Sequence, residues 1–248
     1  MSMLAMFLIA IGLGDVMRRF IGTRWVPPVL AVVVLVVGSL LAGLWHLGDL
    51  PLLVIASVAV VGWNVACERT EVTGTRQGIP LVIIGGAVTA LILLSGWASD
   101  VGGAVGRWVA WAELPESVSA GRVLMVLGVM LVQLTTANHV VRLVLGSVGA
   151  VKPAGQPQAS DRLKGGRLLG PMERLLIVGL GLAGQLTMAS AVVAAKSVIR
   201  FPEINATRNH DEQDTDHVGI DEVVEYFLVG SFASWIFAFA SLALVAAA

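Results

Sequence analysis

Six long stretches of the chain lack Asp, Glu, Lys and Arg, and they limit the fold more than any other feature of the sequence. They cover residues 25–48, 50–67, 77–99, 123–141, 175–195 and 226–248. Each is about as long as the roughly 20 residues that an α-helix needs to cross a bilayer. Only 13% of the residues are charged, against about 25% in soluble domains. We therefore predict an all-α, polytopic bundle of transmembrane helices with six or seven spans.

The first 14 residues form a seventh, shorter apolar run. We interpret residues 1–14 as a tilted span, a half-inserted helix or a helix in the membrane interface. A signal peptide does not fit, because Arg18 and Arg19 follow the apolar run and no basic residue precedes it. The single cysteine, Cys67, cannot form an internal disulfide.

Basic residues are concentrated in alternate connections between the apolar runs. If residues 1–14 span, the connections that hold Arg18, Arg69 and Arg142 are cytoplasmic, since Lys and Arg favour that side. This alternation predicts an N-terminus outside and a C-terminus in the cytoplasm. Six spans with an interfacial first helix would place the N-terminus inside without changing the other sides.

A polar linker divides the chain into two blocks. Residues 152–166 are rich in Pro, Gly, Ser and charge, as in loops. We predict an N-terminal membrane block at 1–151, with a short first helix, four spans and an outer interfacial helix that carries Trp108 and Trp111. Residues 167–248 are predicted to form a two-helix membrane hairpin with an acidic outer loop at 202–221.

The stretch "IVGLGLAGQ" has the G-x-G-x-x-G spacing of dinucleotide-binding turns, which require a strand, a turn and a helix. The membrane spans leave no room for the rest of such a sheet. We favour one membrane helix over residues 172–201, about 45 Å long, with Arg174, Gln185 and Lys196 on one face. The glycines would then allow close approach of a second copy or another membrane protein, at Gly179, Gly181 and Gly184.

Polar residues also gather at both ends of the predicted helices. One helical face at the end of the fourth long run holds Asn138, His139 and Arg142, on the side where Glu173 and Arg174 open the next helix. At the other end we predict that Lys196 or Arg200 pairs with Glu225, since charges in membranes are usually paired. The candidate intramembrane residues are Asn138, His139, Arg142, Glu173, Arg174, Gln185, Lys196, Arg200, Glu225 and Tyr226.

Three functions are compatible with these polar layers. They can lock helices together in a structural, partner-binding or accessory membrane component, which we favour. They can line a pathway for a small solute or a proton through Gln185, or, more remotely, serve a membrane-embedded enzyme. No catalytic constellation stands out, no cofactor is predicted, and no basic block suggests nucleic acid. The acidic loop is interpreted as solvated, with weak divalent-ion binding as the alternative for His210, Asp214, Asp216 and His217.

The C-terminal third contains, in order, "GRLLGPMER", "AAKSVIRFPE" and "EYFLVGSFAS", within about residues 166–235. In these stretches it resembles an uncharacterised family of bacterial, notably actinobacterial, multi-pass membrane proteins. The resemblance implies a protein of the bacterial cytoplasmic membrane and gives no activity. It marks as motif positions Glu173, Arg174, Lys196, Arg200, Glu203, Glu225 and Gly230.

Overall fold

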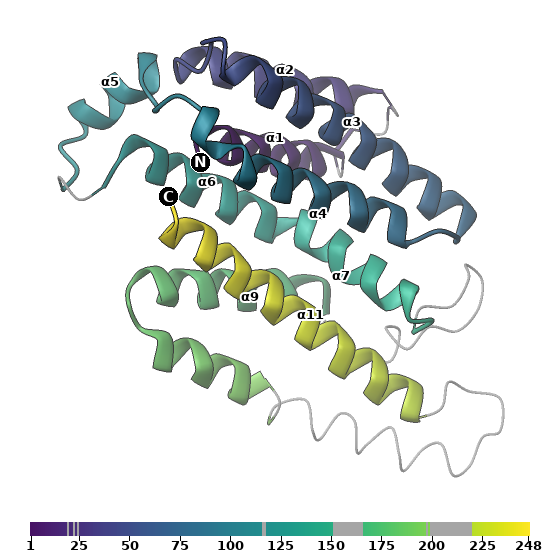
Figure 1. Ribbon diagram of the computed structural model, residues 1–248. Coiled ribbons are helices and arrows are strands. Elements are labelled where there is room, and N and C mark those ends of the chain that lie inside the picture. Colours follow the sequence, from purple (N-terminus) through teal and green to yellow (C-terminus); the bar gives the residue numbers. More distant parts are fainter. Residues whose placement is uncertain are drawn as a thin grey trace. The chain divides into compact units, whose positions relative to one another are not determined.

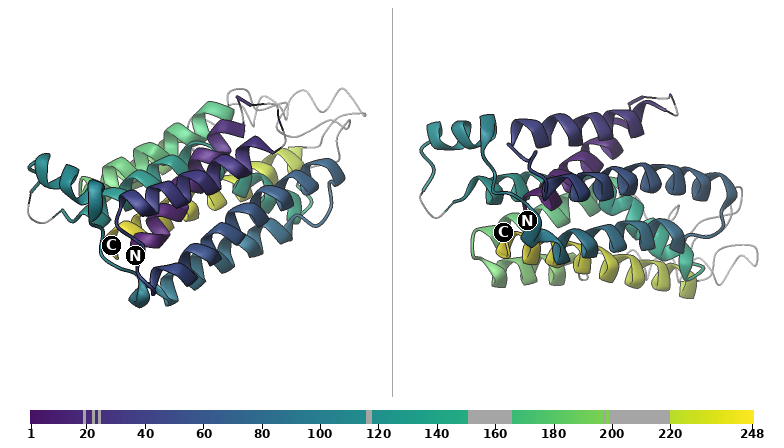
Figure 2. Two further views of the ribbon diagram at one scale, coloured as in Figure 1. Left: turned by 90° about the horizontal axis from the view of Figure 1, so that it is seen from above. Right: turned by 45° about the horizontal axis from the view of Figure 1, so that its top comes forward.

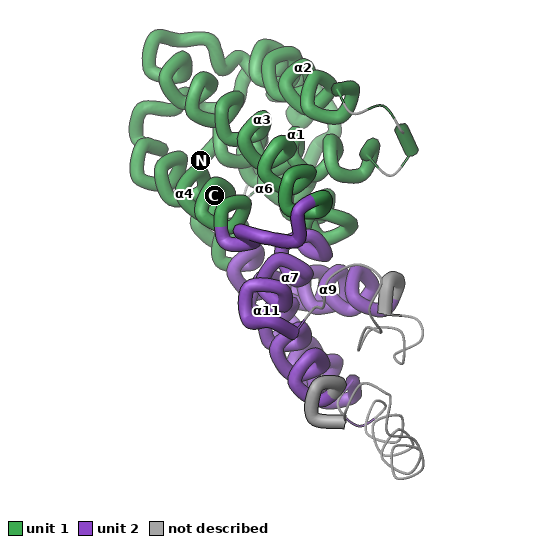
Figure 3. Tube along the Cα trace, turned by 90° about the vertical axis from the view of Figure 1, so that its right-hand side faces the viewer, with its two compact units in different colours: residues 1–72, 79–136, 243–248 green, residues 73–78, 137–242 purple. Residues whose placement is uncertain are grey.

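The computed structural model describes most of the chain, which divides into two compact units. The described residues are 1–18, 20–21, 23, 25–115, 118–150, 166–196, 198 and 220–248, without the side chains of 166–168 and 220–223. Unit 1 comprises residues 1–72, 79–136 and 243–248, and unit 2 comprises 73–78 and 137–242 (Figure 3). All regular structure in these residues is helical, which confirms the predicted all-α class.

Unit 1 is built from the first six α-helices (Figure 1). They are α1 (Ser2–Arg18), α2 (Val26–Leu41), α3 (Asp49–Thr73), α4 (Gly78–Leu93), α5 (Gly103–Trp111) and α6 (Ala120–Leu134), with a 3₁₀ turn, η1 (Ser95–Trp97), after α4. Proline occupies the first turn of α2, where its missing N–H costs nothing. The predicted outer interfacial helix corresponds to α5, whose two tryptophans are exposed.

Helix α1 forms the centre of unit 1. Its residues 3–11 are apolar and buried on every side, chiefly by α2 and α6. Close approach to α6 depends on glycine, because a Cβ atom at Gly128 would lie 2.9 Å from the Cβ of Leu8, and one at Gly12 would lie 2.9 Å from the Cβ of Leu131. The interfacial interpretation of residues 1–14 is therefore wrong, since other helices enclose this segment.

The helices of unit 1 present apolar side chains outward. In α2, Val29, Val33 and Val37 form an exposed stripe, while Ala31 and Leu35 on the other face are buried. Soluble proteins rarely expose large contiguous apolar patches. The exterior of α2 therefore matches an apolar environment better than water.

The number of spans differs from the prediction. In the described residues, α3 and the segment Val224–Ala246 are long and apolar enough to cross a membrane, and the bent pair Ala120–Leu134 and Thr136–Ser147 would make a third. Helices α2 and α4 have 16 residues each, about 24 Å at 1.5 Å per residue. A bundle of six or seven spans is thus not confirmed, because turns shorten the apolar runs. One such turn follows α2, where Gly43 has a φ of 75°.

Unit 2 contains α7 (Thr136–Ser147, from residue 137 on), α9 (Gly166–Leu182), the helix Leu186–Lys196 and most of α11 (Ile220–Ala246). The sequence predicted a block boundary in the linker at 152–166. The units instead divide after residue 136, with residues 73–78 assigned to unit 2 and residues 243–248 to unit 1. Helix α7 belongs with the C-terminal helices because Asn138 bonds Arg174 of α9. A Cβ atom at Gly230 of α11 would likewise contact Leu145 of α7.

A sharp turn separates α9 from the helix Leu186–Lys196. Gly184 has a φ of 74°, which favours glycine. Its N–H donates to the carbonyl of Gly181, and the N–H of Gln185 donates to the carbonyl of Leu180, the two bonds of a Schellman motif. The second helix runs back beside α9 (Figures 1 and 2). The prediction of one long helix over 172–201 is therefore wrong. The dinucleotide interpretation is wrong as well, because residues 174–182 are helical.

Candidate functional site

A buried arginine joins three helices of unit 2. Arg174 lies on α9 and is only 1% exposed. Its Nη2 donates to Oδ1 of Asn138 on α7 at 2.6 Å, and its Nη1 donates to Oγ of Ser234 on α11 at 3.0 Å. A buried charge is tolerated when it is hydrogen-bonded, and both terminal nitrogens of the guanidinium make such bonds. Asn138 and Arg174, which the sequence placed on one side of the bundle, are thus in direct contact.

The neighbouring Glu173 binds the far end of the helical hairpin. Its Oε2 lies 2.6 Å from Nζ of Lys196, and its Oε1 accepts a hydrogen bond of 2.6 Å from Nε1 of Trp235. The Lys196 ammonium also lies 5.8 Å from the ring centroids of Phe227 and Trp235, within the range of cation–π attraction. In one straight helix, Glu173 and Lys196 would be about 35 Å apart.

We call this set the Arg174 cluster: Asn138, Glu173, Arg174, Lys196, Ser234 and Trp235. Its charges contact side chains of the protein itself: Lys196 pairs with Glu173, and Arg174 donates to Asn138 and Ser234. Such a network resists separation of its helices, because removing one partner leaves a buried charge uncompensated. The cluster therefore acts as a lock, in the sense that its contacts hold α7, α9, α11 and the helix Leu186–Lys196 together.

The hairpin overturns two predicted features of the site. Lys196 pairs with Glu173 and not with Glu225, which is exposed. Gln185 is exposed in the turn at the tip of the hairpin, so it does not share a helical face with Arg174 and Lys196. The shared face depended on the single long helix and is wrong for that reason. In the alternative pair, Arg200 with Glu225, the arginine lies outside the described residues.

Of the other predicted residues, three are at least partly exposed and the rest lie outside the described part of the chain. Arg142 is exposed, while His139 and Tyr226 are partly exposed. In the described residues no three His, Cys, Asp or Glu side chains could hold a metal ion together. The remaining predicted residues lie outside the described part of the chain: Arg200, Glu203, His210, Asp214, Asp216 and His217.

One of the three glycines lies against another helix of the same chain. A Cβ atom at Gly181 would collide with Leu242 of α11, so this glycine lets α9 and α11 approach closely. No atom of the described residues lies within 4 Å of a Cβ placed at Gly179 or Gly184. Contact with a second copy or another membrane protein stays a prediction.

A second buried cluster, in unit 1, escaped the sequence analysis. Asp15 of α1 is 1% exposed. Nε1 of Trp63 on α3 lies 3.2 Å from each of its carboxylate oxygens, and Oγ1 of Thr136 donates to Oδ2 at 2.7 Å. We call these three residues the Asp15 cluster. The available signal was an acidic residue at the end of an apolar run that continues as helix.

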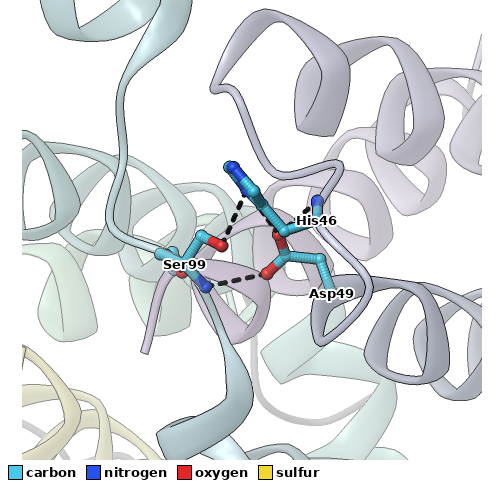
Figure 4. Close-up of polar contacts among 4 residues, drawn as sticks. His46, Asp49 and Ser99 are labelled. Atoms are coloured by element: carbon cyan, nitrogen blue, oxygen red, sulfur yellow. Dashed lines mark hydrogen bonds and ion pairs between the residues drawn. The ribbon is translucent and has the colours of Figure 1, made fainter.

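Three polar residues meet at the opposite end of α1 (Figure 4). Oγ of Ser99 lies 3.0 Å from Nδ1 of His46, and Oδ2 of Asp49 lies 3.6 Å from the same nitrogen. A catalytic triad needs its serine and its carboxylate on different ring nitrogens, so this trio is not one. Asp49 instead accepts the backbone N–H groups of His46 and Ser99, at 3.0 and 2.8 Å.

The trio therefore joins the loop before α3 to the segment after η1. Ser2 adds the start of α1, since its hydroxyl donates to the carbonyl of Ser99 at 2.6 Å.

Comparisons with protein families, with curated proteins and with solved structures give no significant match to this chain. What the fold and its clusters define is an all-helical protein with an apolar exterior and buried polar clusters.

Proposed function

We propose that this chain is a multi-pass integral protein of the bacterial cytoplasmic membrane with a structural or partner-binding, accessory role. The observation that carries the proposal is the Arg174 cluster, in which side chains from α7, α9, α11 and the helix Leu186–Lys196 pair with one another. A transport pathway needs polar groups that a solute can reach. Glu173 is 7% exposed and Arg174 is 1% exposed, which favours a lock.

The exterior of unit 2 supports a bilayer as its surroundings. Helix α11 exposes Leu228, Phe232, Ile236 and Phe239 along one face. Its segment Val224–Ala246 has the length and composition of a span. Burying such a face in lipid removes it from water at no cost in backbone hydrogen bonds, since a helix satisfies its own.

The hairpin also changes the proposed topology. Gly230 lies near Leu145, and Ser234 is level with Arg174 and Asn138. The end of α7 and the start of α11 thus share one end of unit 2, and the contact of Lys196 with Glu173 brings the hairpin back toward it. If the basic linker at 152–166 is cytoplasmic, α11 starts in the cytoplasm and ends outside. This replaces the predicted cytoplasmic C-terminus.

Fusions of a reporter enzyme to the end of α11 test the topology. Alkaline phosphatase, which is active only outside the cytoplasm, should be active at that position. A cytoplasmic reporter such as green fluorescent protein should be dark there. The reverse result would restore the predicted cytoplasmic C-terminus and would argue against a hairpin that returns to its side of entry.

Complementation of a deletion strain tests the role. Gln185→Leu should reach wild-type levels in the membrane and restore any deletion phenotype, because Gln185 lies outside the Arg174 cluster. Glu173→Gln should lower the protein level, and the phenotype should follow that level. A Gln185→Leu protein that is present at normal levels but fails to complement would favour a solute pathway over a structural role.

A further inference from the structure

The Asp15 cluster holds a carboxylate that the structural role of unit 2 does not use. Asp15 and Trp63 are 1% and 0% exposed, and Thr136 is fully buried. We propose that Asp15 is a proton-binding site inside unit 1. The protonated carboxyl group then donates a hydrogen bond to the hydroxyl oxygen of Thr136.

The charged and titratable groups around Asp15 leave its charge uncompensated at ion-pair distance. On α1, the Arg18 side chain is directed to Asn64: its Nη2 donates to Oδ1 of Asn64 at 2.5 Å and to the backbone carbonyl of Asn64 at 3.4 Å. On α3, the neighbouring titratable groups are the buried thiol of Cys67 and, farther along, Glu68, Arg69 and Glu71. Helix α6 carries the neutral, buried Gln133, and α7, which begins at Thr136, carries His139 and Arg142 in its next turns. In the described part of the chain, no cation lies within 4 Å of Asp15.

The hydrogen bonds around Asp15 suit both protonation states. The ionised carboxylate accepts from the indole of Trp63 and from the hydroxyl of Thr136. A protonated carboxyl needs one acceptor for its O–H, and a threonine hydroxyl can accept as well as donate. Uptake of one proton from water at Oδ2 then turns the Thr136 hydroxyl around and leaves the two indole contacts in place. No other bond forms or breaks.

The same contacts argue against a metal ion at this position. A metal cation needs several oxygen ligands around it. Here Trp63 and Thr136 direct N–H and O–H groups at the carboxylate, so their hydrogens occupy the positions from which a cation would bind. A proton, in contrast, needs only the Thr136 oxygen. The chemistry of this shell therefore selects a proton over Na⁺ or a divalent ion.

Protons can reach the site from one end of α1. Asp15 is buried, whereas the next turn of the helix, residues 16–18, is partly exposed. One helical turn rises about 5.4 Å. The carboxylate thus lies about one turn from the accessible end of its helix, while the apolar residues 3–11 fill the helix beyond it.

Infrared difference spectroscopy of the purified full-length protein in lipid tests the proposal. Lowering the pH should produce, reversibly, the C=O band of a protonated carboxyl group. The band should be lost in Asp15→Asn and retained in Asp100→Asn, which removes an exposed aspartate of the same unit. Thr136→Val should keep the band but change its frequency, because the hydrogen-bond acceptor of the carboxyl group is gone.

Three outcomes overturn the proposal. Identical difference spectra for the wild type and Asp15→Asn would show that Asp15 keeps one protonation state. If Asp15→Asn does not fold, identical spectra for the wild type and Thr136→Val lead to the same conclusion. Addition of NaCl against KCl at constant pH should leave the band unchanged, and a sodium-specific change would replace the proton with a metal cation.

Discussion

The contact between Glu173 and Lys196 gives the sharpest prediction, because it exists only if the chain folds back at Gly184. The perturbation is Glu173→Gln, which keeps an amide oxygen for the Trp235 indole and removes the charge. Lys196→Met removes the ammonium and retains an unbranched apolar side chain. Each change therefore isolates the ionic part of the interaction.

The geometry sets the expected magnitude. Opposite charges 2.6 Å apart attract by about 6 kcal/mol at an effective dielectric constant of about 20. Desolvation offsets most of this, and removal of one partner of a buried pair costs about 3–5 kcal/mol. The Lys196 side chain is 22% exposed, so we expect about 3 kcal/mol for Glu173→Gln. The coupling energy of the double-mutant cycle should be about 2 kcal/mol.

Equilibrium unfolding in mixed micelles, with SDS as denaturant and tryptophan fluorescence as the signal, measures all four proteins of the cycle. A parallel cycle with Glu225→Gln in place of Glu173→Gln is the matched control and should give a coupling energy near zero. If the Glu173 cycle gives no coupling and the Glu225 cycle does, the hairpin is refuted and the single long helix returns.

Three further predictions test the packing. Nitroxide labels at Met172 and Val198 in a cysteine-free background would be about 39 Å apart in one straight helix. Double electron–electron resonance should measure a far shorter distance between them. Gly128→Ala should destabilise the protein by about 1–3 kcal/mol through overpacking, whereas Gly85→Ala, with open space around its Cβ position, should stabilise it by up to about 1 kcal/mol, both measured by SDS unfolding. Asp49→Ala leaves two backbone N–H groups without their acceptor and should lower stability by about 1–3 kcal/mol. A wild-type unfolding midpoint for that variant would contradict the role of the trio at the end of α1.

Apolar runs and helical periodicity predicted the helical class and part of the Arg174 cluster. Asn138 lies at a position where its helix faces the start of the next one, and Arg174 is within reach of that face. Both inferences depend only on side-chain spacing along a helix, which the sequence states directly.

Periodicity could not detect the turn at Gly184. A glycine in a long apolar run fits a helix contact and a helix end equally well, and the choice depends on backbone bonds to Gly181 and Leu180. Every prediction that assumed a continuous helix failed with it, including the face shared by Arg174 and Gln185. Asp15 was missed because a search for uncharged runs stops at the first charged residue, although α1 continues to Arg18.

The hairpin of α9 and the helix Leu186–Lys196 has a consequence for how the chain enters a membrane during synthesis. A single span at this position would require the hydrophilic residues that follow it to be carried across the bilayer. If the proposed membrane location holds, the two helices of 17 and 11 residues would enter and leave on one side, so the insertion machinery would carry only the turn at Gly184 into the apolar layer. The contact of Lys196 with Glu173 then closes the hairpin where both helices re-emerge.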